Sequence, residues 1–212
     1  SLTQVFEAVG KIAAGTMTES ELTSLECAAC PGAGSCAGLF TANSMNCLTE
    51  ALGLGLPFNG TIPAVMSDRV RLAKEAGKQI MTLIEKQITP SMILTKTAIM
   101  NAVAVDMAIG GSSNTALHLP AIAHYAGVEL GLRDLDPVAS KVPHLCNLAP
   151  AGKHHIVDLH RAGGIPAIMK ELTDNGLFDD SCMTVTGKTH KENFSQAKIL
   201  DQEVIHPVSS PV

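Results

Sequence analysis

Apolar side chains recur every three or four residues along much of the chain, which is the spacing of one face of an α-helix. The pattern is clearest over 39–52 and 67–86, and we expect a helix in each segment. Shorter stretches of the same pattern predict helices over 2–15, 99–107 and 165–172. The chain should therefore be rich in helix. The clearest apolar positions are Leu39, Ala42, Met45, Leu48 and Leu52 in the first segment and Ala73, Ala76, Ile80, Leu83 and Ile84 in the second.

Residues that typically begin or end helices flank these segments. Thr18 and Glu21 have the spacing of a capping box, in which each side chain bonds the backbone N–H of the other residue. Ser67 or Asp68 should cap the helix over 67–86. Gly110 should end the preceding helix, and the serines that follow it offer a cap for the next one.

Extended structure is predicted in only two places. Residues 183–186 are rich in β-branched side chains and stop at a glycine, which is typical of a strand, and 144–149 is a second candidate. The last residues, 201–212, are polar and contain proline, so we expect a flexible tail behind a partial domain over 1–200.

Composition narrows the class of protein. A chain of 212 residues with 46% apolar and 17% charged residues is long and apolar enough to fold around a core. One tyrosine, no tryptophan and a net charge of −5 give neither stacking platforms nor a basic surface, so we expect no nucleic-acid partner. No apolar run reaches the length of a membrane span, and the N-terminus carries no export signal. Six cysteines are too few for a secreted disulfide scaffold, which favours a reducing compartment such as the cytoplasm.

Four of the cysteines lie close together, and three of them surround a tight loop. Cys27, Cys30 and Cys36 flank the run Pro31-Gly-Ala-Gly34, and Cys47 follows on the next predicted helix. We expect Cys36 at or near the start of that helix, where backbone N–H groups favour the thiolate form that binds iron or zinc. The alternative is that these cysteines are small buried apolar side chains.

A second candidate site is the loop that follows Gly110. Its residues are rich in hydrogen-bond donors and precede a helix, a combination that suits a carboxylate or phosphate. The alternative is a simple helix cap. A third cluster is made of His154, His155, Asp158 and His160, with Arg161 next to it. It offers metal-binding side chains without a known ligand spacing, so a surface loop is the simpler interpretation. The candidate anion-binding residues are Gly111, Ser112, Ser113 and Asn114.

Longer strings of sequence resemble a known family. The run Cys30-Pro-Gly-Ala-Gly-Ser-Cys36-Ala-Gly-Leu-Phe-Thr-Ala-Asn-Ser-Met45 is similar to the dihydroxy-acid dehydratases, within the dihydroxy-acid/phosphogluconate dehydratase family. The similarity continues through Ala108-Ile-Gly-Gly-Ser-Ser-Asn-Thr-Ala-Leu-His-Leu119 and Asp158-Leu-His-Arg-Ala-Gly-Gly-Ile-Pro-Ala-Ile-Met-Lys-Glu-Leu172. It covers nearly the whole chain, with Ala37 standing where the family commonly has glycine.

This resemblance implies a fold, a reaction and cofactors. The fold would be a helix-rich fragment of a layered α/β N-terminal dehydratase domain. The parent enzyme would be a cytoplasmic homodimer that removes water from a small 2,3-dihydroxy-3-methyl acid to give a 2-oxo acid, in valine and isoleucine biosynthesis. It would use an iron–sulfur cluster, 2Fe–2S or 4Fe–4S, and Mg²⁺. Cys36 matches a cluster-ligand position of the family.

The resemblance also implies that other site residues lie outside this chain. The family's Cys-Asp-Lys motif would precede the first residue, and the catalytic serine and a metal-binding glutamate belong to a C-terminal domain. We therefore expect no catalytic residue in this chain, and no turnover by the chain alone. Two rivals stay open: a sugar-acid or phosphogluconate dehydratase of the same family, and a non-enzymatic zinc or thiol redox module built on Cys27, Cys30 and Cys36.

Overall fold

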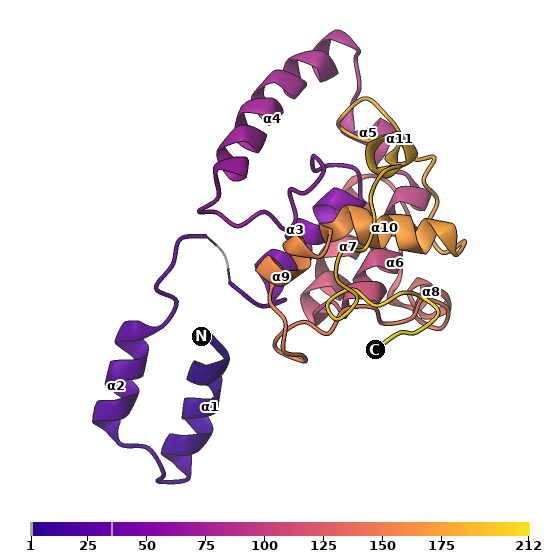
Figure 1. The fold of residues 1–212 in the computed structure, drawn as a ribbon. Helices are drawn as coiled ribbons and strands as arrows, with labels where there is room; N and C mark the ends of the chain where they lie inside the picture. The colour runs from indigo at the N-terminus through magenta and orange to yellow at the C-terminus, as the bar shows by residue number, and fades with distance from the viewer. Residues whose placement is uncertain (1, 35) are drawn as a thin grey trace.

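The computed structural model describes residues 2–34 and 36–212, and these are predominantly helical (Figure 1). The predicted helix-rich character is therefore confirmed. The helices are α1 (Leu2–Ala13), α2 (Glu19–Ala28), α3 (Thr41–Ala51), α4 (Ser67–Glu85), α5 (Pro90–Ile93), α6 (Lys96–Ile109), α7 (Ser113–Tyr125), the short 3₁₀ helix η1 (Leu132–Asp134), α8 (Asp136–Ala139), α9 (Ile156–Arg161), α10 (Gly164–Asp174) and α11 (His190–Phe194).

Helix α6 forms the centre of the core. Its residues from Ala98 to Ile109 are nearly all buried, because other elements cover every side of it. Helices α3, α7, α8 and α10 pack directly against it. A helix that is apolar all round is typical of such a central position. The Thr95 hydroxyl caps its N-terminus by accepting a hydrogen bond from the backbone N–H of Ala98, and Gly110 ends it in the left-handed conformation, as predicted.

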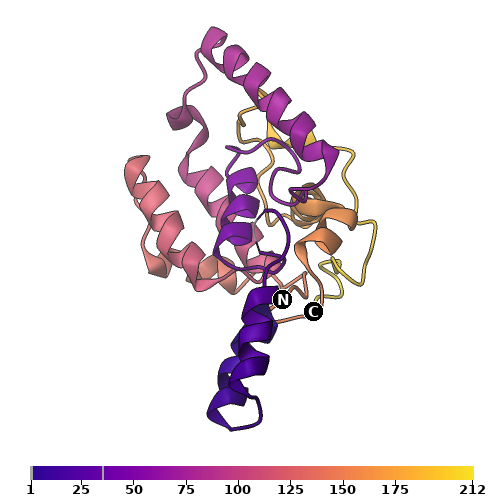
Figure 2. The same ribbon diagram turned by 90° about the vertical axis from the view of Figure 1, so that its left-hand side faces the viewer.

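Helices α1 and α2 form an antiparallel pair that projects from the body (Figures 1 and 2). The predicted capping box at the start of α2 is present, with Thr18 and Glu21 bonding each other's backbone N–H groups. The pair contacts the body through Phe6, whose ring lies 6.1 Å from that of Phe40 in an edge-to-face arrangement. The cysteine loop therefore begins at the base of a projecting arm.

Helix α4 lies at the rim of the body and has no buried residue (Figure 1). The predicted cap is wrong. Ser67 is already the first helical residue, Met66 takes the N-cap position, and no side chain caps the helix. Gln79 ties its C-terminal half to the body by donating to the Val185 carbonyl at 2.8 Å.

The predicted strand over 183–186 is wrong. In the described residues extended pairing is limited to isolated bridges, one of which joins Met183 to Thr189. Thr184 donates both its backbone N–H and its hydroxyl to the Lys188 carbonyl, so a local turn uses the groups that a strand would pair with a neighbour. In the second candidate segment, 144–149, extended pairing consists of two isolated bridges, one at Cys146 and one at Leu148. Within the described part of the chain, no layered sheet is formed.

The prediction of a loose tail over 201–212 is also wrong. Val204 and Ile205 are buried in the core, with exposed fractions of 3% and 0%. Backbone N–H groups of His206 and Val212 donate to carbonyls of the preceding 144–145 segment. The polar, proline-containing composition of this stretch concealed two apolar side chains that anchor it.

The buried tail predicts a contrast between two identical substitutions. Val204→Ala should lower the free energy of unfolding by about 2 kcal/mol, because it removes buried methyl groups. Val212→Ala should change it by less than about 0.5 kcal/mol, because Val212 is 53% exposed. Urea unfolding followed by circular dichroism measures both. Equal, negligible losses would mean that the tail does not pack on the core in solution.

None of the helices in the described ranges is long and apolar enough to cross a membrane.

Candidate functional site

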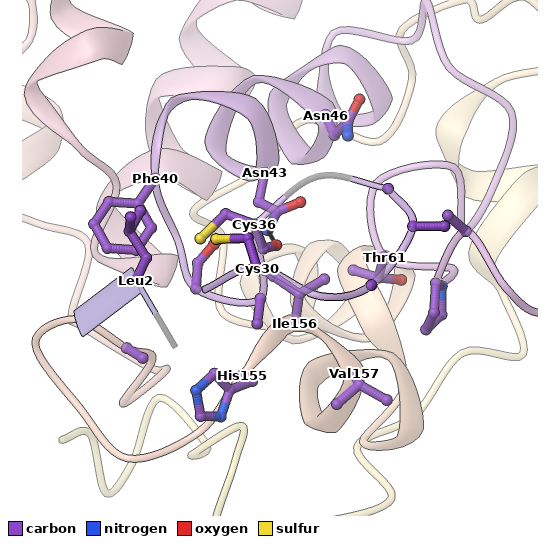
Figure 3. Close-up of a pocket in the computed structure, with 18 of the residues that line it drawn as sticks. Leu2, Cys30, Cys36, Phe40, Asn43, Asn46, Thr61, His155, Ile156 and Val157 are labelled. Carbon is purple, nitrogen blue, oxygen red and sulfur yellow. Dashed lines mark hydrogen bonds between the residues drawn. The ribbon is translucent and has the colours of Figure 1, made fainter. Parts of the chain in front are cut away.

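A cavity of about 690 Å³ lies where the cysteine loop meets the body (Figure 3). Its walls come from the loop around Cys30 and Cys36, from the N-terminal parts of α1, α3, α4 and α9, and from the loops that carry residues 60–64 and Ala149. Residues that line it include Cys30, Gly32, Gly34, Cys36, Phe40, Asn43, Asn46, Thr61, Ala64, Arg69, His155 and Ile156. The long-range folding of the chain thus places both cysteines in one hollow.

Cys36 lies near the start of a helix, as predicted, but not on its first turn. Helix α3 begins at Thr41 with Phe40 at its N-cap, so Cys36 lies in the loop before it. Asn43 explains the offset. Its buried side-chain amide donates to the carbonyl of Cys36 and to that of Gly38, the latter at 2.7 Å, and so folds the loop over the start of the helix. The groups of the loop that bond the start of α3 are therefore the Cys36 and Gly38 carbonyls, which accept from the Asn43 side chain.

Two further hydrogen bonds fix the loop to the cavity floor. Leu39 donates its N–H to the Ala149 carbonyl at 2.6 Å, and Ile156 donates to the Ala37 carbonyl at 2.9 Å. Gly38 has no room for a side chain, because a Cβ atom there would lie 2.8 Å from the Ala149 carbonyl oxygen. The backbone next to Cys36 is therefore held on both sides.

The charge of the cavity favours an anion. Arg69 and His155 line it, and no carboxylate does so among its described lining residues. The Arg69 guanidinium is held in place by Asn59, through the side-chain oxygen at 3.0 Å and the carbonyl at 2.9 Å, and by the Ile62 carbonyl. A positive, rigid wall of this kind suits a bound anion or anionic group.

Glu50 organises one wall of the cavity from behind. It is 2% exposed, and its carboxylate accepts hydrogen bonds from the backbone N–H groups of Phe58 at 2.8 Å and Gly60 at 3.0 Å. Burial raises the pKa of Glu50 to about 7, although the two backbone donors and the Arg69 charge favour the ionised form. Apolar periodicity does not mark this residue, because its role depends on how the loop after α3 folds back over the helix.

The loop after Gly110 does not line the cavity. It contacts α3, a helix that does line it. The Ser44 hydroxyl donates to the Ser112 hydroxyl at 3.3 Å, and the Asn114 side-chain amide donates to the same Ser112 oxygen at 3.1 Å. Ser112 occupies the N-cap position of α7, as predicted, but its side chain makes no capping bond. Adjacent residues of α3, Asn43 and Ser44, thus contact the two loops that the sequence singled out. The role of Gly111, Ser112, Ser113 and Asn114 in anion binding stays a prediction.

Asp106 supports this second loop from inside the core. One carboxylate oxygen accepts a hydrogen bond from the Thr115 hydroxyl at 2.7 Å, and the other, Oδ1, is buried with no hydrogen-bond partner. Burial raises the pKa of Asp106 to about 6, and the Thr115 bond opposes that rise. A Cβ atom at Gly111 would come within 1.7 Å of Oδ1, so the glycine is required for this packing.

The residues of the third cluster are divided between two surroundings. The His160 ring is bonded to the Thr61 hydroxyl at 3.2 Å, and burial together with the nearby Arg69 and Arg161 charges lowers its pKa. His155 instead lines the cysteine cavity. Within residues 2–34 and 36–212, no three His, Cys, Asp or Glu side chains come together as a metal site would need.

Comparison with known proteins shows which family the chain belongs to. The dihydroxy-acid/6-phosphogluconate dehydratase N-terminal family matches residues 1–193. The chain therefore belongs to this family.

Individual relatives narrow the similarity. The chain is 59% identical over 210 residues to the dihydroxy-acid dehydratase of Desulfatibacillum aliphaticivorans, and equally so to that of Halothermothrix orenii. It is 59% identical over 211 residues to the dihydroxy-acid dehydratase of Moorella thermoacetica. In each case the match covers 99% or more of this chain but 38% of the relative. The chain thus spans well under half the length of the curated relatives that it matches.

Proposed function

We propose that the chain is part of a dihydroxy-acid dehydratase, a hydro-lyase that converts 2,3-dihydroxy-3-methyl acids to 2-oxo acids in valine and isoleucine biosynthesis. The observation that carries this proposal is 59% identity, along essentially the whole chain, to relatives that bear this name. The parent enzyme would be a cytoplasmic homodimer whose remaining segments complete a layered α/β domain.

Cys36 is the residue that would hold an iron–sulfur cluster, either 2Fe–2S or 4Fe–4S. The cavity suits such a group in three respects: thiolates are the ligands that iron–sulfur clusters use, Cys36 and Cys30 both face it, and its lining is positive. When bound, the cluster would supply a Lewis-acidic iron for the leaving hydroxyl group. Two thiols are fewer than a cluster needs, so further ligands would come from outside the chain.

Mg²⁺ does not fit the described residues in the same way. The cavity lining contains no carboxylate, and Mg²⁺ prefers oxygen ligands of that kind. Asp106 and Glu50 are committed to Thr115 and to backbone N–H groups, respectively. The Mg²⁺ ligands would therefore belong to other parts of the parent enzyme.

The residues of this chain would bind the substrate and hold the cysteine loop in position. Arg69 would attract the carboxylate of the dihydroxy acid to the cavity. Asn43 would fix the position of Cys36 through its carbonyl, and Glu50 would fix the loop that carries Gly60 and Thr61. None of these residues is assigned a proton-transfer step.

Iron and acid-labile sulfide per chain, after anaerobic reconstitution, test the assignment of Cys36. In the complete parent enzyme, which would supply the further ligands, we expect iron and sulfide to bind and to fall at least about tenfold in Cys36→Ala, because loss of even an outer-shell partner weakens a metal site by about that factor. Cys27→Ala is the matched control and should load normally, because Cys27 is exposed and lies outside the cavity lining. Equal loading of all three proteins would contradict the assignment.

Turnover by the chain alone should be undetectable, because the ligand set is incomplete. Formation of a 2-oxo acid from a 2,3-dihydroxy-3-methyl acid, by chain purified free of other dehydratases, would contradict this expectation. The family also includes 6-phosphogluconate dehydratases. Preference of the parent enzyme for 6-phosphogluconate over a branched dihydroxy acid would favour that rival.

A further inference from the structure

We propose that Cys30 and Cys36 form a dithiol that hydrogen peroxide converts to a disulfide within the cavity. Both cysteines line the same hollow, and Figure 3 draws their sulfur atoms toward the same part of it. Both are free thiols in this structure. The pairing requires nothing of the proposed function, whereas its consequence for cluster binding rests on that function.

The other four cysteines are poorly placed to compete. Cys47 and Cys146 are fully buried in the core, and burial raises the pKa of each thiol, which disfavours the reactive thiolate. Cys27 is exposed on α2 and does not line the cavity, and Cys182 lies outside it as well. Cys30 and Cys36 are the two cysteines among the described residues of the lining.

The backbone turns Cys30 back toward Cys36. Helix α2 ends at Ala28, and Cys30 then adopts a φ of 49°, in the left-handed region that non-glycine residues rarely occupy. Further along, Gly34 has a φ of 97°, and a Cβ atom there would lie 2.7 Å from the Ala64 Cβ on the opposite wall. The intervening loop is therefore bent closely against the cavity, so its two ends face one space.

Exposure assigns an order to the two oxidation steps. Cys30 is exposed and Cys36 is half-buried, so peroxide reaches Cys30 first. The Cys30 thiolate attacks one peroxide oxygen, the O–O bond breaks, and the departing hydroxide takes up the thiol proton to give water and a sulfenic acid. The Cys36 thiolate then attacks the Cys30 sulfur, the S–O bond breaks, and the second hydroxide leaves as water with the Cys36 proton. Two thiols are oxidised, and one peroxide is reduced to two waters.

The disulfide would withdraw Cys36 from metal binding. A thiolate that ligates iron must be free, so the oxidised loop could not contribute a ligand until the disulfide is reduced. The pair would thus couple the occupancy of the site to the redox state of its surroundings.

Thiol counting on the unfolded chain, after brief peroxide treatment of the folded, metal-free chain, tests the pairing. The unaltered chain should lose two of its six thiols and recover them with dithiothreitol. Cys27→Ser, the matched control, should lose two of its remaining five. Cys30→Ser should lose none to a disulfide, and in Cys36→Ser a dimedone probe should label Cys30, because the sulfenic acid then has no partner. Fragmentation mass spectrometry of the unaltered chain identifies the bonded pair without relying on a variant.

Three outcomes would overturn the proposal: six thiols retained after peroxide, a bond between Cys27 and Cys30, or a disulfide that joins two chains. Iron uptake separates it from the proposed function. Oxidised, metal-free parent enzyme that takes up at least tenfold less iron than the reduced parent enzyme supports both. A reduced parent enzyme that loads iron equally with and without Cys36, together with a Cys30–Cys36 disulfide in the chain, contradicts only the role of Cys36 as a cluster ligand.

Discussion

Gly111→Ala should destabilise the chain by about 3 kcal/mol or more, which is a large share of the stability of a typical domain. The new methyl group would lie 1.7 Å from Asp106 Oδ1, which is far closer than atoms in contact can approach. Asp106 cannot simply turn away, because it is buried and its other oxygen is bonded to Thr115. Chemical unfolding of the variant and the unaltered chain measures the loss.

The steric cause can be isolated by removing the obstacle. Asp106→Ala combined with Gly111→Ala should cost at least about 1 kcal/mol less than the sum of the single substitutions, because the two sites share one contact. Gly77→Ala is the matched control in an open part of α4, where a Cβ atom meets nothing within 4 Å. It should stabilise the chain by about 0.5 kcal/mol, since alanine is the better helix former. Additive losses in the double variant would contradict the packing of Gly111 on Asp106.

Glu50 should make the chain less stable as the pH rises toward neutrality. Its pKa is raised from 4.5 in a free carboxyl group to about 7 in the folded chain, so folding strengthens its hold on the proton. The resulting stabilisation is complete below pH 4.5 and is lost as the pH rises through about 7. The difference between the two pKa values corresponds to about 3 kcal/mol.

Glu50→Gln isolates this contribution from those of other buried groups, such as Asp106. The amide oxygen can accept from only one of the N–H groups of Phe58 and Gly60, so the variant should be about 2 kcal/mol less stable than the unaltered chain at pH 5. By pH 8 the difference should close or reverse, because only the unaltered chain carries a buried charge there. Urea unfolding at both pH values measures it, and parallel stability profiles would contradict a raised pKa for Glu50.

The sequence alone predicted the helical part of the fold well, because each helix has its own local signals. The apolar periodicity marked α3 and α4, the Thr18 capping box marked the start of α2, and Gly110 marked the end of α6. The family resemblance added the class of protein and singled out Cys36, which lines the cavity at the cysteine loop. These features all depend on residues close together in the sequence.

The errors arose where hydrogen bonds and burial that the apolar pattern does not reveal decide the structure. The strand over 183–186 is replaced by a turn, and the supposed tail is held by two buried side chains at Val204 and Ile205. Glu50 and Asp106 were missed for the same reason, since each carboxylate bonds a group eight to ten residues further along the chain, a contact that the apolar pattern does not reveal. Apolar periodicity carries no information about which polar side chains will become buried.

The adjacency of Asn43 and Ser44 sets a limit on how this part of the chain can change in length. Both side chains must point in their present directions, one toward the Cys36 carbonyl and the other toward Ser112. One residue inserted within the helix before them would rotate everything beyond it by about 100°. Both contacts would then be lost together. Insertions or deletions at the start of α3 should therefore be tolerated far less than single substitutions on the projecting arm of α1 and α2.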